Sequence, residues 1–553
     1  STDAATSQTL LIDVEKGTLV PHFLEKDYAL HEDPKGSLLI LQPAVPLRNS
    51  ARFVVGVRNL PSGSTLNGDN AQASGYFQRI RDKETKSMHE LARQQDFDEL
   101  VFPELEKFGW KREEMQLAWD FCTVSWESST GRAQHIVRES VRRLESGEAP
   151  SSYMIEDIVP EQCNGGKLKG REVWGSVRGP SYTVFPGPGA ELLRVLHGGV
   201  PIPNGEVDVR FVSIIPCSAL AQKKASQIVQ FGHGLLLTKH EAVESGWLRV
   251  HAEDTASVVL AVDWVGMSAF DFPIVARILL SDLAAFKIVP DQLQQSFANG
   301  ASAVWYMRNR LRSDAAFAAK DGSTVLSADT PVTFYGMSQG GVLGGGYVLS
   351  SPFIEKAVLG VPGTPFALLV SRSIEFLNSY LKILQIQVLR PTHIRIAITL
   401  LQQLWDVGES AGWLSEWWDE SKGIGPKRFL LQSGLGDALV PSLGAEVMGR
   451  ALNCTLLSPK TRPVYGLAEK EGPLTEGSAL VEFGFIGAPP EPKANIPPPL
   501  SINVHDLVRR SVPGMQQVKR FLLDGVIEQT CPGPQGCTDL PRPGRLPKED
   551  LVF

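Results

Sequence analysis

The sequence has no apolar run of the length that a membrane-spanning helix needs, which is about 18 to 20 residues. Its first residues, STDAATSQTL, lack the basic flank and the apolar stretch of a signal peptide. Basic residues are not clustered either: the formal net charge is −7, and Lys and Arg are scattered along the chain. Because a surface that grips phosphate backbones needs clustered basic charge, we expect no nucleic-acid partner and no integral membrane segment.

Cysteine is scarce, and none of the six forms a CxxC pair, which excludes a zinc ribbon or a thioredoxin-like site. Cys531 and Cys537 bracket PGPQG, a loop short enough for a disulfide to close, and Cys163 lies in a similar loop, QCNGG. Cys122 and Cys454 are equally well interpreted as buried free thiols. The pattern favours an oxidising compartment, so an extracellular or periplasmic location is expected, with the cytoplasm as the alternative.

The composition is that of a globular protein, with 43% hydrophobic and 21% charged residues over 553 positions. Up to about residue 225, short apolar stretches such as RFVVGVRNL and VDVRFVSIIP are broken by Gly, Pro and Asn, a pattern typical of antiparallel strands. Two stretches, 97–108 and 131–145, carry apolar residues at three- and four-residue spacing, which predicts amphipathic helices. Residues 1–225 are therefore expected to form a mainly β N-terminal module.

From about residue 226 the pattern changes to apolar strands that alternate with longer helical stretches. IVQFGHG, SVVLAVDW, TPVTFYG, KAVLGVPG and KRFLLQSG are short and rich in β-branched residues, which predicts a parallel sheet covered on both faces. The alternation predicts a doubly wound α/β domain formed by residues 226–363 and 427–553. Between these parts, residues 364–426 hold helical segments rich in Leu, Ile and Trp, which we expect to form a cap.

A nucleophile motif follows one of these strands. PVTFY runs directly into GMSQG, residues 336–340, and a Gly-rich helical stretch comes next. This is the context of the nucleophile elbow of α/β-hydrolases, in which glycines allow a tight turn and the serine hydroxyl projects above the sheet. GESAG at 408–412 has the same spacing, but the helical LLQQLWDV precedes it, which favours a helix end and a turn. We therefore predict Ser338 as the nucleophile, with Ser410 as the alternative.

The chain order of this fold, Ser, then Asp or Glu, then His, narrows the search for the base and its orienting acid. Only His393 and His505 follow Ser338, and His393 lies in the expected cap, so His505 is the predicted base. Asp437 comes after the strand KRFLLQSG, at the end of a parallel strand, where a carboxylate can reach a histidine ring. Asp506 is a competitor, although side chains adjacent in sequence seldom face each other. The predicted triad is Ser338, Asp437 and His505.

A tetrahedral intermediate also needs two N–H donors for its oxyanion. Gln339, the residue after the nucleophile, is expected to provide one, and Leu235 in the loop FGHGL is expected to provide the other. The ring of His233 is expected to brace this loop rather than to transfer protons. His233, Gly234 and Trp264 are predicted as the residues beside the substrate.

Several of these motifs together resemble a family of large secreted bacterial esterases and lipases of the α/β-hydrolase fold. The resemblance rests on GHGLLL, AVDWVGMS, GMSQGG, GDALVP and NVHDLVRR, and upstream LQPAVPLRNSARFVVGVRNL and LAWDFCTVS are similar to the N-terminal domain of extracellular lipases. It covers most of the chain. It implies an α/β-hydrolase fold, the triad of Ser338, Asp437 and His505, no metal or organic cofactor, and frequent export from the cytoplasm.

These residues predict a serine carboxylic ester hydrolase that acts through an acyl-enzyme on a small-molecule or lipid ester. An interfacial triacylglycerol lipase is the nearest alternative, because a cap rich in Leu, Ile and Trp can be a mobile lid. The same site is compatible with an amidase or an acyltransferase. A non-catalytic binding protein on this scaffold is the remaining alternative, since fold alone does not establish function.

Overall fold

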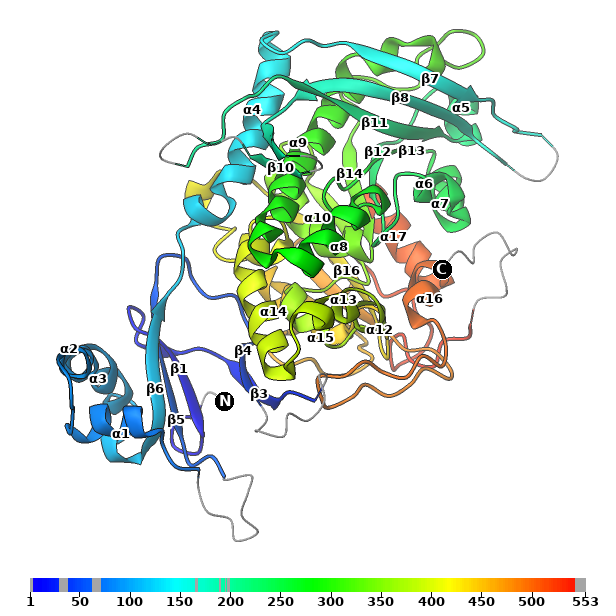
Figure 1. Cartoon of the computed structure of the whole chain (residues 1–553). Coiled ribbons are helices and arrows are strands. Elements are labelled where there is room, and N and C mark those ends of the chain that lie inside the picture. The colour runs from blue at the N-terminus through cyan, green and yellow to red at the C-terminus, as the bar shows by residue number, and fades with distance from the viewer. Residues whose placement is uncertain are drawn as a thin grey trace. The chain divides into compact units, whose positions relative to one another are not determined.

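The computed structural model describes residues 3–28, 38–61, 71–164, 168–187, 190–193, 195 and 199–542. The chain divides into two compact units (Figure 1). The smaller unit comprises Ser1–Asp27 and Ser37–Trp126, and the larger comprises Tyr28–Gly36 and Glu127–Phe553.

The smaller unit is built on an antiparallel sheet in the order β2-β1-β5-β6. Its strands are β1 (Thr9–Asp13), β2 (Thr18–Leu19), β5 (Arg52–Arg58) and β6 (Met115–Cys122), beside a separate pair of β3 (His22–Lys26) and β4 (Leu39–Pro43). Its helices are α1 (Gly75–Asp82), α2 (Met88–Asp96) and α3 (Phe102–Glu106). Phe97, Phe102 and Trp110 fill the core between the helices and one face of the sheet. The smaller unit therefore combines an antiparallel sheet with several helices.

An eleven-stranded mixed sheet forms the centre of the larger unit, in the order β18-β17-β19-β16-β15-β14-β12-β13-β11-β8-β7. Its strands are β7 (Tyr153–Val159), β8 (Arg171–Pro180), β11 (Glu206–Ile215), β12 (Ile228–Gly232), β13 (Val258–Val262), β14 (Val332–Met337), β15 (Lys356–Gly360), β16 (Arg428–Gly434), β17 (Cys454–Ser458), β18 (Glu469–Glu471) and β19 (Ser478–Phe483). A separate pair is formed by β9 (Thr183–Gly187) and β10 (Ala190–Leu193). The five parallel strands that the sequence predicts, β12 to β16, are confirmed as neighbours.

Residues 127–225 belong to the larger unit, not to the N-terminal module in which we expected them. Strand β11 pairs antiparallel with β13, with Phe211 opposite Val262, and β8 and β7 extend the sheet beyond it. The alternation of apolar residues is the same in a separate β module and in antiparallel strands at one side of a mixed sheet. The boundary therefore lies near residue 126 rather than at 225.

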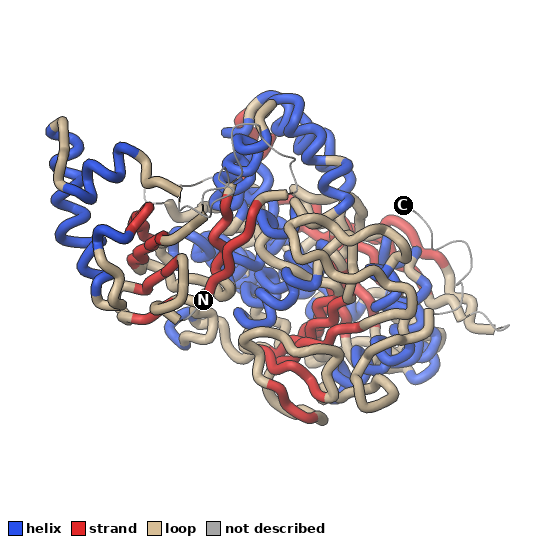
Figure 2. Tube along the Cα trace, turned by 90° about the horizontal axis from the view of Figure 1, so that it is seen from below, coloured by secondary structure: helices blue, strands red, loops and turns tan. Residues whose placement is uncertain are grey.

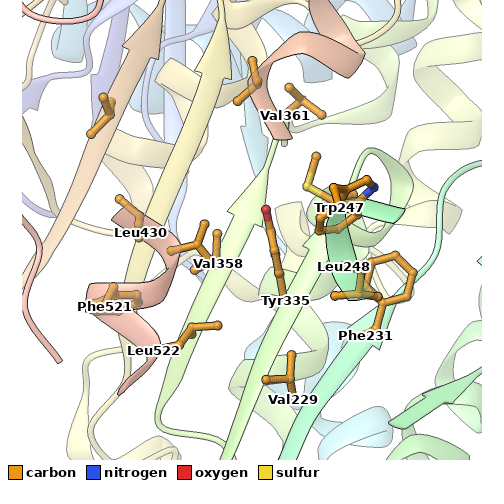
Figure 3. Close-up of a cluster of buried hydrophobic side chains, with 14 of the residues drawn as sticks. Val229, Phe231, Trp247, Leu248, Tyr335, Val358, Val361, Leu430, Phe521 and Leu522 are labelled. Atoms are coloured by element: carbon orange, nitrogen blue, oxygen red, sulfur yellow. The ribbon is translucent and has the colours of Figure 1, made fainter. Parts of the chain in front are cut away.

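Figure 2 draws helices in blue and strands in red, and outside the cap the helices of the larger unit lie around the large sheet. They are α4 (Arg132–Ser146), α5 (Cys217–Gln222), α6 (Glu241–Glu244), α7 (Gly246–Thr255), α8 (Phe272–Ser281), α9 (Ile288–Asn309), α10 (Gln339–Ser350), α15 (Ser442–Ala451), α16 (Val504–Arg510) and α17 (Val512–Asp524). On one face, Tyr335 and Val358 pack with Trp247 of α7 and Phe521 of α17 (Figure 3). On the other, Phe334 meets Tyr347 of α10, with 5.6 Å between ring centroids. Neighbouring residues of β14 thus serve opposite layers, as strand geometry requires.

The expected helical cap is inserted between β15 and β16. It consists of α11 (Phe366–Val370), α12 (Ile374–Asn378), α13 (Tyr380–Gln387) and α14 (Pro391–Trp405), followed by the short helical turns Ser410–Trp413 and Glu420–Lys422. The larger unit is therefore an α/β-hydrolase fold with a helical cap, as predicted. A search of the described residues finds no helix that is both long and apolar enough to cross a membrane.

Four of the six cysteines form disulfides. Cys531 pairs with Cys537, which confirms the predicted loop closure, and Cys163 pairs with Cys217. Cys454 is a buried free thiol, whereas Cys122 is exposed, so the interpretation of both as buried is wrong for Cys122.

Candidate active site

Ser338 lies at the sharp turn between β14, which ends at Met337, and α10, which begins at Gln339. Its backbone has a φ of 56° and a ψ of −122°, which residues with side chains rarely adopt and which stores strain. The turn is tight, because a Cβ on Gly336 would lie 2.1 Å from the carbonyl oxygen of Gly340. GMSQG therefore forms the expected elbow, with Ser338 at the N-terminus of a helix.

Ser410, the alternative nucleophile, is fully buried. Its hydroxyl donates to the carbonyl of Val342 and accepts the N–H of Gly346 at 3.2 Å, and both of these residues belong to α10. The contact is close, since a Cβ on Gly345 would lie 2.6 Å from Oγ of Ser410. Ser410 therefore holds the GESAG segment against α10 by hydrogen bonds, and its buried hydroxyl has no access to a substrate.

Asp437 and His505 form a buried hydrogen-bonded pair, with 2.7 Å between Oδ2 of Asp437 and Nδ1 of His505. Oδ1 of Asp437 accepts the N–H of Leu439 at 2.8 Å and that of Val440 at 3.1 Å. Asp437 lies in the turn after β16, and His505 lies in the first turn of α16. Because Nδ1 holds the hydrogen of this bond, Nε2 of His505 is left as the basic nitrogen.

The competing histidine and aspartate lie elsewhere. His393 is exposed on α14 of the cap, and Asp506 binds Nε of Arg509 at 2.7 Å instead of His505. Among the described residues, no hydrogen bond joins His505 to Ser338. Such bonds are often long in unliganded enzymes and tighten when substrate binds.

The loop after β12 lies beside the nucleophile, because a Cβ on Gly234 would lie 3.8 Å from Cβ of Ser338. Leu235 lines the same pocket as Ser338 and Gln339. The N–H of Gly234 donates to Glu241 at 2.7 Å, whereas that of Leu235 has no partner within the described chain. The N–H of Gln339 is the first of α10 and has no acceptor inside the helix. Both predicted donors are therefore available to an oxyanion.

The rings of His233 and Trp264, two of the residues predicted beside the substrate, have structural roles, and for His233 this is the loop-bracing role that the sequence predicts. Nδ1 of His233 donates to the carbonyl of Gly234 at 2.9 Å, and Nε2 accepts the N–H of Trp264 at 2.8 Å. Burial lowers the pKa of His233 to about 4, so the ring is neutral and braces the loop. The ring of Trp264 packs against Phe297 and Tyr347, with centroids 6.0 and 5.7 Å away, and does not line the Ser338 pocket.

A buried ion pair that the sequence analysis missed joins the loop after β12 to the helix of His505. Glu241 of α6 accepts the N–H of Gly234 and binds Nη1 of Arg509 at 3.2 Å. Arg509 lies on α16, one turn after His505. Burial raises the pKa of Glu241, and the charge of Arg509 opposes this rise. No local pattern marks the two residues as partners, because 268 positions separate them.

Ser338 opens on a narrow pocket of about 10 Å³, close to the space that one water molecule needs. Its apolar lining consists of Leu235, Val342, Phe366, Leu369, Phe376, Leu439 and Val440. Leu439 and Val440 also hold Asp437 through their N–H groups, so the pocket borders the Asp437–His505 pair.

Glu375 of α12 is the charged side chain of this lining. Burial raises its pKa, and the charge of nearby His505 opposes the rise. Glu375 is not predictable as a pocket residue from the sequence, because it lies in a cap segment, SIEFL, that has the pattern of an ordinary surface helix.

No family model matches the chain, and no curated protein matches it. Several solved structures are similar to part of it. An acetyl xylan esterase from Thermoanaerobacterium sp. is 13% identical, with a TM-score of 0.35, over 64% of this chain and 88% of that protein. An esterase from Pyrobaculum calidifontis is 10% identical, with a TM-score of 0.30, over 71% of this chain and 92% of that protein.

An S-formylglutathione hydrolase from Agrobacterium tumefaciens is 12% identical, with a TM-score of 0.27, over 59% of this chain and 91% of that protein. At these identities and TM-scores the likeness is too weak to bear on the reaction of this chain. The arrangement of Ser338, Asp437 and His505 rests on the geometry of the chain itself.

Proposed function

We propose that this protein hydrolyses carboxylic esters through an acyl-enzyme on Ser338. The observation that carries the proposal is the 2.7 Å bond between Asp437 and Nδ1 of His505 at the border of the Ser338 pocket. This bond fixes the tautomer in which Nε2 can take a proton, and the carboxylate stabilises the imidazolium that forms. The strained turn at Ser338 also supports the proposal, because this turn places the serine hydroxyl at the start of a helix.

In the first half of the reaction, Oγ of Ser338 attacks the ester carbonyl carbon while its proton passes to Nε2 of His505. The carbonyl oxygen becomes an oxyanion, which the N–H groups of Leu235 and Gln339 stabilise. When the C–O bond to the alcohol breaks, His505 returns the proton to the leaving oxygen. The acyl group then remains on Ser338 as an ester.

In the second half, a water molecule attacks the acyl carbon and gives its proton to Nε2 of His505. The second tetrahedral intermediate collapses, the acid leaves, and the proton returns to Oγ of Ser338. The same two N–H donors stabilise both oxyanions, so one site serves both steps.

The experiment that tests this proposal compares the intact protein with Ser338→Ala and Ser410→Ala on p-nitrophenyl esters. We expect Ser338→Ala to lose on the order of 10⁴-fold or more of the rate, because triad residues act as a unit. Ser410→Ala should remain an esterase with lower stability, because it removes the hydrogen bonds of the buried Ser410 hydroxyl with Val342 and Gly346. An intact protein that turns over no ester, or a Ser338→Ala variant with full activity, would contradict the proposal.

Anilide substrates and alcohol acceptors, added to the same assay, test for an amidase and an acyltransferase. A rate that rises sharply once a long-chain ester exceeds its solubility would identify an interfacial lipase instead.

We also propose that the protein works in an oxidising compartment, outside the cytoplasm. The disulfides Cys163–Cys217 and Cys531–Cys537 support this, because such bonds persist mainly in secreted and periplasmic proteins. Fractionation of the source cells followed by thiol labelling tests it: oxidised protein outside the cytoplasm agrees with the proposal, and reduced protein in the cytosol does not.

A further inference from the structure

A second cavity lies between the cap and helix α8. It has a volume of about 50 Å³ and an almost wholly apolar lining, to which α8, α11, α12, α13 and α14 contribute. Val275, Leu401 and Trp405 are among its walls, and Gln402 and Tyr380 are the lining residues with an amide and a hydroxyl group. We call this space the cap cavity. Neither step of the proposed reaction uses it.

The cap cavity adjoins the Ser338 pocket, because Phe366 and Phe376 line both. The two rings meet edge to face, with 6.0 Å between their centroids. On the cavity side, Phe366 stacks on Trp405 with centroids 4.1 Å apart, and Phe376 lies 5.5 Å from Tyr380. Two phenyl rings therefore form the boundary between the nucleophile and an apolar space about five times larger.

We propose that the cap cavity receives the acyl chain of the ester, so that the preferred substrates are esters of straight aliphatic acids longer than acetate. This inference rests on the proposed function and deepens it. The Ser338 pocket alone has about the space that one water molecule needs, so a longer chain that stays buried has to continue between Phe366 and Phe376, which line both spaces. Rotation of these rings joins the two spaces.

The part of the ester that enters the cap cavity is the acyl part, rather than the alcohol part. The leaving oxygen must lie beside His505, which protonates it. No residue of α16 or of the turn around Asp437 lines the cap cavity in the described chain. The described lining of the cap cavity therefore contains no histidine or carboxyl group that could protonate a leaving alcohol, so we assign this cavity to the acyl chain that stays on Ser338.

The occupant must also be uncharged and flexible. The described lining of the cap cavity has no Asp, Glu, Lys or Arg side chain to pair with a charge, and a buried unpaired charge is costly. A straight hydrocarbon chain gains free energy from each methylene that it buries and can bend past the two rings.

A matched pair of variants on α14 tests the inference. Leu401 lines the cap cavity, whereas its neighbour Leu400 is 57% exposed. Leu401→Trp fills the cavity, and Leu400→Trp makes the same change on the outer surface of the helix. Hydrolysis is measured for p-nitrophenyl acetate, butyrate and octanoate, and for acetate esters of alcohols of increasing length.

We expect the ratio of kcat/KM for octanoate to that for acetate to fall by about tenfold or more in Leu401→Trp, the loss typical of a missing apolar contact. The ratio should stay at its original value in Leu400→Trp, and the alcohol series should not respond to either change. An unchanged ratio in Leu401→Trp, an equal fall in both variants, or a response of the alcohol series would overturn the inference. If Leu401→Trp does not fold, Ala367→Leu fills the same cavity from α11.

Binding of 1-octanol separates a failure of this inference from a failure of the proposed function. We expect 1-octanol to raise the unfolding temperature of the intact protein and of Leu400→Trp, but not that of Leu401→Trp. If no ester is hydrolysed and this pattern still holds, the esterase proposal fails and the apolar chain site stands. If 1-octanol has the same effect on all three proteins, the cap cavity does not take the chain.

Discussion

Gly340 has no room for a side chain, because a Cβ there would lie 2.0 Å from the carbonyl oxygen of Gly232. Gly232 ends the strand β12, which leads into the oxyanion loop, and Gly340 lies in the first turn of the nucleophile helix. The segments that carry the two N–H donors of the proposed oxyanion hole are therefore in direct backbone contact. Backbone atoms cannot move aside as a flexible side chain can.

Gly340→Ala should lower the free energy of unfolding by about 1–3 kcal/mol, as overpacked substitutions do, and should lower ester hydrolysis as well. Gly449→Ala is the control, because Gly449 lies within α15 and a Cβ there would have its nearest neighbour at 3.5 Å. Because Ala favours a helix more than Gly does, Gly449→Ala should raise the free energy of unfolding by about 0.5–1 kcal/mol. Urea denaturation of both variants checks the prediction, and equal effects of the two substitutions would refute it.

Glu409 of the GESAG segment is a buried carboxyl group that no catalytic step uses. Burial raises its pKa to about 8, and neighbouring Asp406 adds to the rise. In the unfolded chain its pKa is near the ordinary 4.5, so the folded protein holds this proton more tightly. The contribution of Glu409 to stability is therefore fully present below pH 4.5 and is lost as the pH rises towards 8.

Glu409→Gln should remove this pH dependence. The amide keeps an oxygen that can accept the N–H of Phe366, which lies 3.2 Å from Glu409. We expect the variant to gain stability over the intact protein as the pH rises from 5 to 9. Unfolding temperatures measured across this range check it, and parallel curves for the two proteins would contradict it.

Helices α6 and α16 are joined by the ion pair of Glu241 and Arg509, which links the oxyanion loop to the helix of His505. Arg509→Met should cost about 3–5 kcal/mol of stability, because it leaves the buried carboxylate of Glu241 without its partner. The double variant with Glu241→Gln should be less destabilised than the sum of the single changes, because neither charge then remains unpaired. Denaturation of all four proteins measures the coupling, and additive effects would show that the pair does not act as a unit.

The sequence predicts elements well where a local pattern is enough. The apolar strands β12 to β16, the elbow at Ser338 and the helical cap all follow from spacing over a few residues. The pairing of Glu241 with Arg509, the disulfide partner of Cys163 and the place of Glu375 in the pocket were not predictable in this way. Each depends on segments that only the folded chain brings together.

Trp264 illustrates the same limit within a motif. AVDWVGMS begins with the last two residues of β13, so Trp264 follows the end of a parallel strand, where binding residues are often found. Its ring instead packs on Phe297 of α9 and Tyr347 of α10 and does not line the Ser338 pocket. The alternation of side chains along a strand predicts the face on which each one lies. A turn interrupts this alternation, so the face cannot be predicted for a side chain that follows the turn.

Over the whole molecule, the two disulfides differ in the length of chain that they close. Cys163 and Cys217 are 54 positions apart, whereas Cys531 and Cys537 are 6 apart. In the chain-entropy account, the longer loop stabilises by about 4 kcal/mol and the shorter by about 2 kcal/mol.

Cys163→Ala with Cys217→Ala should therefore lower the free energy of unfolding more than Cys531→Ala with Cys537→Ala does. Guanidinium denaturation of the two double variants, with the intact protein as reference, tests the order. An equal or reversed loss would mean that native-state packing around the cysteines, and not loop closure, decides their contribution.

The close fit of Ser410 between the glycines of α10 limits how freely the cap can be exchanged. Engineering of enzymes often treats an inserted cap as a cassette, to be replaced by that of a relative in order to change selectivity. Here the segment that follows the cap packs closely on α10, the helix that begins after Ser338. Oγ of Ser410 forms hydrogen bonds with this helix and occupies the space that a side chain at Gly345 would need. A transplanted cap that lacks a small hydroxyl residue at this position would shift the helix beneath the nucleophile, so grafts should be joined before residue 408 rather than at β16.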